Sequence, residues 1–406
     1  MSLNDPVVRG DEKIGDSNYS ISWLLKALNL HDHKWTFGED IRSLTALPRD
    51  VLISKDKGYA SKIYSIRLTV GEHIHHVIAK LPSDFHMKQR LENLFNEGKL
   101  TKEQLETENR KNFEMISSIH NRELEFYRIS NENFKDLHCP QFIHGEEMTE
   151  EQEGIILMED FTDRCAKDIS SFNGLSKNQV LPIVEDLARL QCQSLNIPNL
   201  KQRFPPINSL IQAVTRFSLM SANVLADRNL PWFTLDIAKE IFEIVQPDSM
   251  LELYSAQQEE FGMPSVLVHA DLWPGNMLWE KNEGDEEAKM MAIIDWQNYH
   301  AGSFTTDLAV LLGVSMDGET RRKEEKTILE FFFEKLNEYK KLVHEAEINL
   351  THDQVENSYR KSLRYAVLPM MMTVVTNPKD DEPQNGETEG KLTKRLKFLL
   401  EDVFGK

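Results

Sequence analysis

The stretch His269-Ala270-Asp271-Leu272-Trp273-Pro274-Gly275-Asn276 is the most informative segment of this 406-residue chain. It has the pattern H-x-D-x-x-x-x-N, in which a carboxylate and an amide follow one another on a short loop. Apolar runs at 266–268 and 290–294 flank the stretch and are typical of buried strands. Asp295 follows the second run directly. The pattern predicts a loop between strands that brings Asp271, Asn276 and Asp295 together.

These three side chains supply the groups that phosphoryl transfer from ATP requires. The transfer needs a carboxylate beside the attacking hydroxyl and hard oxygen ligands that hold Mg²⁺ on the triphosphate. Asp271 fits the role of the base, and Asn276 and Asp295 fit the role of metal ligands. We interpret His269 as a packing and hydrogen-bonding residue. Asp307 opens an apolar helix, and we expect it to accept backbone amides from the Asp271 loop, with a helix cap as the alternative.

Size and charge narrow the possible classes of function. A chain of 406 residues with 40% hydrophobic content can bury a large core, and two lobes are the natural expectation. The net charge of −19 disfavours nucleic-acid binding and adhesion to anionic membranes, because both need positive potential. The three cysteines form no C-x-x-C pair, and we find no signal peptide or membrane-spanning stretch. We therefore expect a reduced, cytoplasmic protein without membrane insertion, of unknown oligomeric state.

Hydrophobic periodicity divides the chain into two parts. The elements expected in the first part are a helix at 21–28, strands at 60–70 and 74–81, and a helix at 111–130. Those expected in the second part are long helices at 179–195, 321–345 and 354–376, and a final helix that ends near Phe404. We predict an α+β, bilobal fold. Residues 1–160 would form a small β-rich lobe that binds ATP, and residues 161–406 a larger helical lobe with the catalytic loop and the acceptor site.

A lysine and a glutamate of the first lobe are candidates for phosphate binding. Lys80 ends the second strand, where a strand lysine of kinases contacts the α- and β-phosphates. Taken alone, a solvated lysine is the simpler interpretation. Glu123, however, lies on the apolar stripe of its helix, and a carboxylate on an inward face needs a cationic partner. We therefore predict that Glu123 pairs with Lys80 and that both residues contribute to catalysis.

Two further segments complete the predicted nucleotide site. Gly58 lies in a turn before the first strand, where its backbone would approach the phosphates, and Ser61 would donate a hydrogen bond to them. An ordinary β-turn is the alternative interpretation. Met158, Glu159 and Asp160 end the first lobe, and we expect their backbone groups to pair with adenine. The side chains of this hinge carry little information, because backbone groups would make the contacts.

The chain resembles the choline kinase and aminoglycoside phosphotransferase superfamily, and within it the CHK-kinase-like group, also called ecdysteroid kinase-like. The matching strings occur in family order at 57–64, 123–127, 157–160, 269–276, 294–297 and 307–308. Trp273 and the string Asp295-Trp296-Gln297 are the most specific to the group. The resemblance implies a protein-kinase-like fold, MgATP and a small-molecule hydroxyl acceptor. For the site residues it implies the roles given above.

Two positions depart from the expected patterns. Ala270 stands where relatives usually have Gly, a mild change that is compatible with activity. Asp295 is followed by Trp296-Gln297 in place of Phe-Gly, and no A-P-E segment follows. The span from Asp295 to Asp307 is too short for a phosphorylated activation loop. The sequence therefore argues against a protein kinase.

We expect transfer of the γ-phosphate of MgATP to a hydroxyl of a small acceptor, such as a steroid-like alcohol or a glycoside. Choline or ethanolamine phosphorylation is one alternative. A quaternary ammonium needs an aromatic or acidic box, which Trp273, Trp296 and Tyr299 would supply, although core packing explains these aromatics equally well. A catalytically silent nucleotide-binding or scaffold protein is the other alternative. The sequence leaves the identity of the acceptor open.

Overall fold

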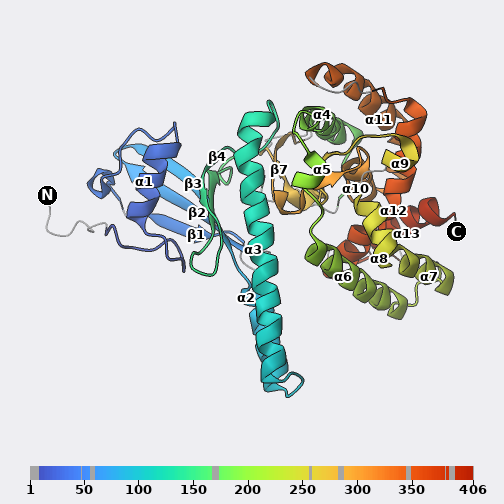
Figure 1. The fold of residues 1–406 in the computed structure, drawn as a ribbon, viewed down its shortest axis with the longest axis horizontal. Helices are drawn as coiled ribbons and strands as arrows, with labels where there is room; N and C mark the ends of the chain where they lie inside the picture. The colour runs from blue at the N-terminus through green and yellow to red at the C-terminus, as the bar shows by residue number, and fades with distance from the viewer. Residues whose placement is uncertain are drawn as a thin grey trace. The chain divides into compact units, whose positions relative to one another are not determined.

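Two compact units make up the protein, and Figure 1 shows the course of the chain. Unit 1 consists of Met1–Asn131 and Pro140–Arg164, and unit 2 of Glu132–Cys139 and Cys165–Lys406. The computed structural model describes residues 9–46, 48–54, 60–166, 173–255, 258–281, 288–343, 349–379, 381–383 and 389–405. The predicted α+β fold class is confirmed, because unit 1 holds a five-stranded sheet and unit 2 is mainly helical.

The sheet of unit 1 is antiparallel throughout, with strand order β1-β2-β3-β5-β4. Its strands are β1 (Arg49–Leu52), β2 (Ser61–Val70), β3 (His73–Pro82), β4 (Phe142–Glu146) and β5 (Ile155–Glu159). The strands expected at 60–70 and 74–81 are thus confirmed as β2 and β3. They form a tight hairpin. Its turn needs a positive φ, and Gly71 adopts a φ of +60° that residues with a Cβ disfavour.

Alternation along β3 decides which side chains meet which helix. Helix α1 (Ile21–His31) lies along one face of the sheet (Figure 1), where its Leu24 and Leu25 pack with Ala79 in the core of unit 1. Successive side chains of a strand point to opposite faces. Lys80 therefore points away from α1, and it meets Glu123 of helix α3 on the other face.

Helix α3 (Lys102–Asn133) is longer than expected, since the polar segment before residue 111 forms its first turns. Helix α2 (Phe85–Asn96), which precedes it, was not predicted, although Met87, Leu91 and Leu94 follow helical spacing; none of its residues is buried.

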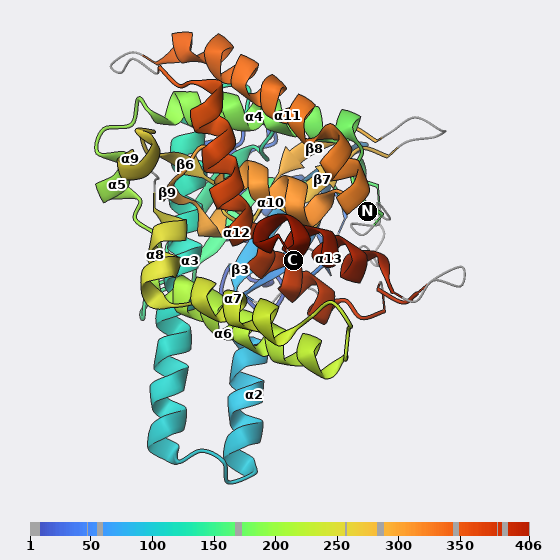
Figure 2. The same cartoon turned by 90° about the vertical axis from the view of Figure 1, so that its right-hand side faces the viewer.

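Unit 2 is built around α10 (Thr306–Ser315), all of whose residues are buried. Figure 2 shows this helix among its neighbours α4, α11, α12 and α13, which all contact it. The described helices around it are α4 (Lys177–Ser194), α5 (Leu200–Arg203), α6 (Asn208–Asp227), α7 (Leu235–Ile244), α8 (Pro247–Tyr254), α9 (Gln258–Phe261), α11 (Gly318–Tyr339), α12 (His352–Thr376) and α13 (Lys391–Phe404). The four long helices expected from periodicity are confirmed as α4, α11, α12 and α13.

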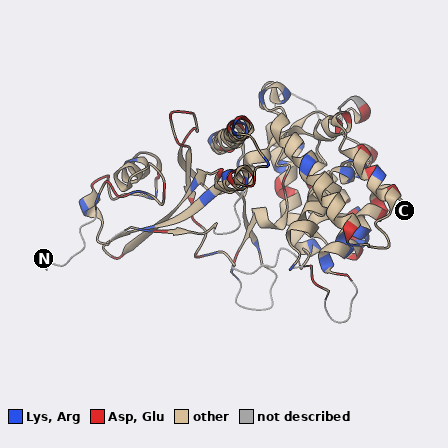
Figure 3. Cartoon of the chain, turned by 90° about the horizontal axis from the view of Figure 1, so that it is seen from below, with Lys and Arg blue, Asp and Glu red and all other residues tan. Residues whose placement is uncertain are grey.

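Two short two-stranded sheets of unit 2 position the loop that carries Asp271. Strand β6 (Val266–Val268) pairs with β9 (His300–Gly302), and β7 (Met277–Trp279) pairs with β8 (Met290–Ile293). The expected strands on either side of the loop are thus present as β6 and β8. No helix among the described residues combines the length and apolarity needed to cross a bilayer. Figure 3 shows acidic and basic residues interleaved along the helices of unit 2.

Candidate functional site

The loop between β6 and β7 brings Asp271 and Asn276 into direct contact. Nδ2 of Asn276 donates to the Asp271 carbonyl oxygen at 2.9 Å and to its carboxylate Oδ2 at 3.0 Å. Because the amide nitrogen is used in this way, Oδ1 is the atom of Asn276 that a cation would take. The second segment joins the first through its backbone, since Ile294 N–H donates to Asn276 O at 2.9 Å. Asp295 follows directly after this hydrogen bond, so its backbone is held close to Asn276.

Asp307 holds the backbone of the same loop. Its Oδ2 accepts the His269 N–H at 2.7 Å and its Oδ1 accepts the Ala270 N–H at 2.8 Å. All of this side chain is buried, whereas the helix cap position is taken by Thr305. The preferred expectation, that Asp307 accepts amides from the loop, is confirmed. Both amide hydrogens would otherwise be buried without an acceptor, which costs about 1–3 kcal/mol for each group.

Two residues of the site have left-handed backbones. Ala270 and Asp295 both have a φ of +66°. This region favours glycine, because a Cβ approaches the following carbonyl there. A glycine at the position of Ala270 would adopt this conformation without the Cβ contact. Asp295 has this conformation two residues after the end of β8, so the chain leaves the strand direction there.

His269 uses both ring nitrogens for structure. Its Nδ1 accepts the Asp271 N–H at 3.2 Å, so Nε2 carries the proton and donates to Ile294 O at 3.0 Å. The ring is buried and lies edge-on to Trp296, with centroids 4.5 Å apart. The structural role expected for His269 is confirmed, and the carboxylate of Asp271 is the group of this loop that is suited to take a proton.

The electrostatics of the loop favour a cation. Burial raises the pKa of Asp271 to about 8, the Asp295 carboxylate also raises it, and the hydrogen bond from Asn276 lowers it. Burial raises the pKa of Asp307 to about 6, against two backbone hydrogen bonds that lower it. Carboxylate and amide oxygens are the donors that Mg²⁺ prefers, and nucleotide sites often use only one or two of them beside phosphate and water. The donor set of Asn276 and Asp295 fits this ion.

In unit 1, Lys80 and Glu123 form the expected ion pair. Lys80 Nζ lies 2.6 Å from Glu123 Oε2, and the two side chains are 9% and 2% exposed. His120, one helical turn before Glu123, is buried too, and its Nε2 lies 3.0 Å from Glu146 O. Burial lowers the pKa of His120 to about 4, and the Lys80 ammonium also lowers it. Contact of Lys80 with phosphate stays a prediction.

The other predicted nucleotide contacts have different surroundings. Gly58 lies outside the described residues. Ser61 begins β2 opposite Pro82 and is partly buried, and Met158 pairs with Ile78 inside the sheet. Their contact with phosphate or adenine stays a prediction.

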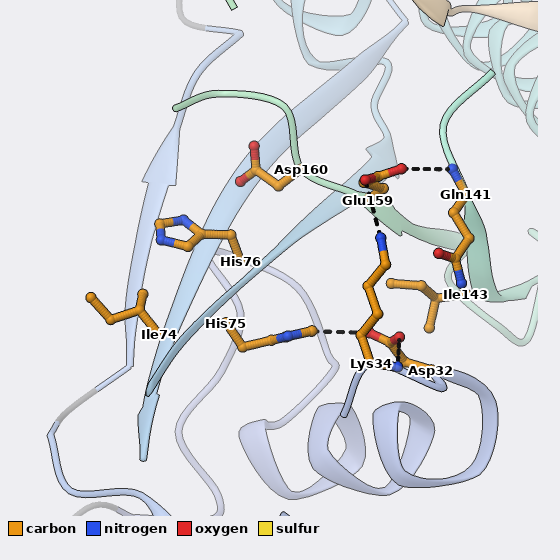
Figure 4. A pocket seen from close by; sticks show the side chains of 9 residues that line it. All are labelled: Asp32, Lys34, Ile74, His75, His76, Gln141, Ile143, Glu159 and Asp160. Carbon is orange, nitrogen blue, oxygen red and sulfur yellow. Dashed lines mark hydrogen bonds and ion pairs between the residues drawn. The ribbon is translucent and has the colours of Figure 1, made fainter. Parts of the chain in front are cut away.

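Glu159 and Asp160 line a pocket of about 190 Å³ in unit 1, shown in Figure 4. Glu159 Oε1 pairs with Lys34 at 3.1 Å and with Arg164 at 2.8 Å. Asp160 accepts the Thr162 N–H at 2.7 Å and the Ser65 hydroxyl. Both side chains thus have protein partners, so any contact with adenine would fall to the backbone of this segment.

The aromatic residues considered for a choline box divide into two groups. Trp296 and Tyr299 are fully buried, and Trp296 donates its indole N–H to Ile293 O at 3.1 Å. Trp273 is partly exposed, and its indole packs over Gly275, where an added Cβ would lie 2.3 Å from Cη2. Core packing therefore accounts for the two buried aromatics.

Sequence reasoning missed two tyrosines that reach the loop. The hydroxyl of Tyr365, on α12, lies 3.1 Å from the carbonyl oxygen of Ala270 and 3.2 Å from the hydroxyl of Tyr254, on α8. Both tyrosines lie in helical, mainly apolar surroundings, so their type and spacing are those of ordinary core residues. No local pattern distinguishes them.

Comparison with known proteins gives a family and two relatives. The model of the family DUF1679, described as "Uncharacterized oxidoreductase dhs-27", matches residues 49–405. The Caenorhabditis elegans protein of that name is 27% identical over 284 residues, which are 66% of this chain and 33% of the relative. "Uncharacterized kinase-like protein D1044.1", also from Caenorhabditis elegans, is 24% identical over 255 residues, 63% of this chain and 65% of the relative. The matches thus span a third and just under two thirds of these relatives.

Among solved structures, a spectinomycin phosphotransferase in complex with ADP and spectinomycin is 12% identical. The comparison covers 94% of this chain and 96% of that one, with a TM-score of 0.40. At this identity and TM-score it leaves the reaction open.

Proposed function

From the premise that the chain belongs to the DUF1679 family, we propose that it is a small-molecule kinase, which transfers the γ-phosphate of MgATP to a hydroxyl group. The observation that carries this proposal is the contact between Asp271 and Asn276 at 3.0 Å, with Asp295 beside them. A relative named kinase-like supports it. The name oxidoreductase belongs to a relative of which the match spans only 33%. Within kinases, the strings quoted from the sequence favour the CHK-kinase-like group.

Each residue of the loop has a defined role in this proposal. The acceptor oxygen bonds to the γ-phosphorus, the bond from that phosphorus to the β–γ bridging oxygen breaks, and ADP leaves. Asp271 takes the proton of the hydroxyl. Asn276 and Asp295 would hold Mg²⁺, which supplies positive charge to the β- and γ-phosphates. Asp307 and His269 keep the Asp271 backbone in place, as their hydrogen bonds to the loop indicate.

Lys80 and Glu123 belong to the nucleotide side of the proposal. The ion pair orients the Lys80 ammonium, which would contact the α- and β-phosphates. Ser61 and the backbone of Met158, Glu159 and Asp160 would add contacts to phosphate and adenine. We propose ATP as the nucleotide on these grounds.

The acceptor is a small molecule in this proposal, with a steroid-like alcohol or a glycoside as the leading class. This choice rests on the resemblance to the CHK-kinase-like group. Choline and ethanolamine are the competing acceptors. Burial of Trp296 and Tyr299 removes two of the three aromatics that a box for a quaternary ammonium would use.

The test is a search for the labelled product. The protein is incubated with ATP labelled in the γ-phosphate, Mg²⁺ and a metabolite extract, and with choline, ethanolamine, sterol and glycoside panels. Labelled products are identified by mass. We expect label on an alcohol with the wild type, and turnover lower by about 10²–10⁴-fold with Asp271→Asn, while ATP binding survives. Equal labelling by both proteins would remove Asp271 from its role, and no labelling at all would favour a silent nucleotide-binding protein.

A further inference from the structure

One face of α12 contacts the two segments that hold Asp271. Ser358, Ser362 and Tyr365 follow one another at helical spacing and therefore lie on one side of the helix. The hydroxyls of Ser358 and Ser362 lie 2.6 and 2.8 Å from Thr305 Oγ1, at the start of α10. The hydroxyl of Tyr365 lies 3.1 Å from the carbonyl oxygen of Ala270. All of these side chains are buried.

The direction of the tyrosine hydrogen bonds follows from the chemistry of the groups. Tyr365 Oη lies 3.1 Å from the Ala270 carbonyl oxygen and 3.2 Å from Tyr254 Oη. Tyr365 Oη is the donor in both contacts, so its single hydroxyl hydrogen is shared between the Ala270 carbonyl oxygen and Tyr254 Oη. The result is a buried hydroxyl that donates to the backbone of the loop and has Tyr254 as its second acceptor.

These contacts hold both ends of one peptide group. The Ala270 carbonyl and the Asp271 N–H belong to the same planar unit. The carbonyl accepts from Tyr365, and the N–H donates to His269 Nδ1 at 3.2 Å. The plane of this peptide determines the direction in which the Asp271 side chain leaves the backbone. The conformation of Ala270, with φ +66°, is disfavoured and needs such contacts to persist.

We propose that Tyr365 is a positioning residue for Asp271. The inference rests on the proposed kinase function. Without the Tyr365 hydroxyl, the Ala270 carbonyl loses its donor, the 270–271 peptide can rotate, and the carboxylate spends less time beside the acceptor hydroxyl. The effect falls on turnover, because Tyr365 is placed against the backbone of the base and against neither predicted metal ligand.

Three variants that each lose a single hydroxyl test the proposal. Tyr365→Phe removes the donor to Ala270. Tyr254→Phe removes the second acceptor and leaves the Tyr365 hydroxyl with Ala270 alone. Tyr359→Phe is the matched control, because Tyr359 lies on the same helix, is fully buried, and donates instead to Glu325 Oε2 at 2.8 Å. Each variant removes one hydroxyl group from a buried tyrosine and no carbon atom.

Two measurements are made on the full-length proteins. Amide hydrogen exchange, followed by mass spectrometry on the peptide covering residues 269–276, reports the loop directly. Turnover of MgATP is measured with water as acceptor and with the best acceptor of the product search. We expect Tyr365→Phe to raise exchange in this peptide and to lower kcat about tenfold, equivalent to about 1.4 kcal/mol, with KM for ATP unchanged. Tyr254→Phe keeps the donor to Ala270, so exchange in this peptide and kcat should not differ from those of Tyr359→Phe, which should change neither quantity.

Each outcome decides the question. Unchanged exchange in Tyr365→Phe, or a kcat equal to that of Tyr359→Phe, overturns the positioning role. If Tyr365→Phe does not fold, Tyr254→Phe decides in its place, because exchange in this peptide above that of Tyr359→Phe would overturn the positioning role. If the wild type turns over no acceptor, the kinase proposal fails independently of Tyr365. The exchange result alone then decides whether Tyr365 fixes the Asp271 backbone.

Discussion

Lys80 and Glu123 form an ion pair at 2.6 Å with both side chains buried. Burying two charges costs several kcal/mol for each ion, and a pair of this kind often stabilises a fold no better than apolar residues of the same volume. A contribution to stability is therefore a weak reason for these residues to be there. A role in holding a phosphate-binding ammonium is a stronger one, and it leads to a prediction that separates stability from activity.

Removing one member of the pair should destabilise unit 1. Glu123→Ala takes away the carboxylate nearest to a buried ammonium, and we expect a loss of about 3–5 kcal/mol in the free energy of unfolding. The combined variant Lys80→Met with Glu123→Leu should have a free energy of unfolding within about 1 kcal/mol of that of the wild type, yet it should bind MgATP poorly. Urea denaturation and nucleotide titration measure the two quantities. Normal MgATP affinity in the combined variant would show that Lys80 does not contact phosphate.

Asp295→Asn should abolish the part of ATP binding that depends on Mg²⁺. Asn tolerates the left-handed backbone of this position, so the change removes charge with little effect on the loop. The wild type should gain more thermal stability from ATP with Mg²⁺ than from ATP with a chelator, because a ligand at about a hundred times its Kd adds about 2.7 kcal/mol. The Asp295→Asn variant should gain the same thermal stability from ATP with Mg²⁺ as from ATP with a chelator. The same Mg²⁺-dependent gain in both proteins would contradict the assignment of Asp295 as a metal ligand.

Ala270→Gly should be nearly neutral. Relief of the left-handed strain is worth about 1–2 kcal/mol, but the greater freedom of unfolded glycine costs about 0.5–1 kcal/mol and the lost methyl burial about 0.8 kcal/mol. Ala270→Val should lose about 3 kcal/mol, since a β-branched side chain is strained at this φ and has no room in a buried site. Urea unfolding of both variants checks the prediction. A stable valine variant would mean that the backbone of Ala270 is not held in the left-handed region.

Unit 1 should lose stability in acid because of His120. Its pKa is about 4 in the folded protein, below the ordinary 6.5, so the unfolded chain binds a proton that the folded one excludes. The contribution of neutral His120 to the free energy of unfolding is fully present above pH 6.5. It is lost as the pH falls from 6.5 to about 4, and the total loss is about 3 kcal/mol. His120→Gln should flatten the stability curve in this window, while keeping a donor for Glu146 O.

The matched control for this pH series is His86→Gln on α2, because His86 is exposed. It should retain the wild-type pH dependence. An equally steep acid loss in His120→Gln would assign the effect to other groups. Thermal unfolding at half-unit pH steps provides the measurement.

Local patterns predicted several parts of the protein well. The alternation along 60–70 and 74–81 and the glycine at the turn specify the hairpin of β2 and β3. The helical stripe around Glu123 placed an acid on a buried face, and the need of a buried carboxylate for a cation led to Lys80. Helix α2 and the helices between residues 200 and 261 were not predicted individually; among these, α5 and α9 have four residues each, too few to produce a clear period.

By itself, the sequence determined which chemical groups this protein has. It also determined that Asp271 and Asn276 meet on a short loop, because only four residues separate them and the distance between their side chains is therefore restricted. Tertiary structure decided how that loop is held. Ala270 is fixed by Asp307 and by Tyr365, which is 95 residues away along the chain. Contacts over such separations leave no periodic trace, because they depend on how whole helices pack and not on the order of neighbouring residues.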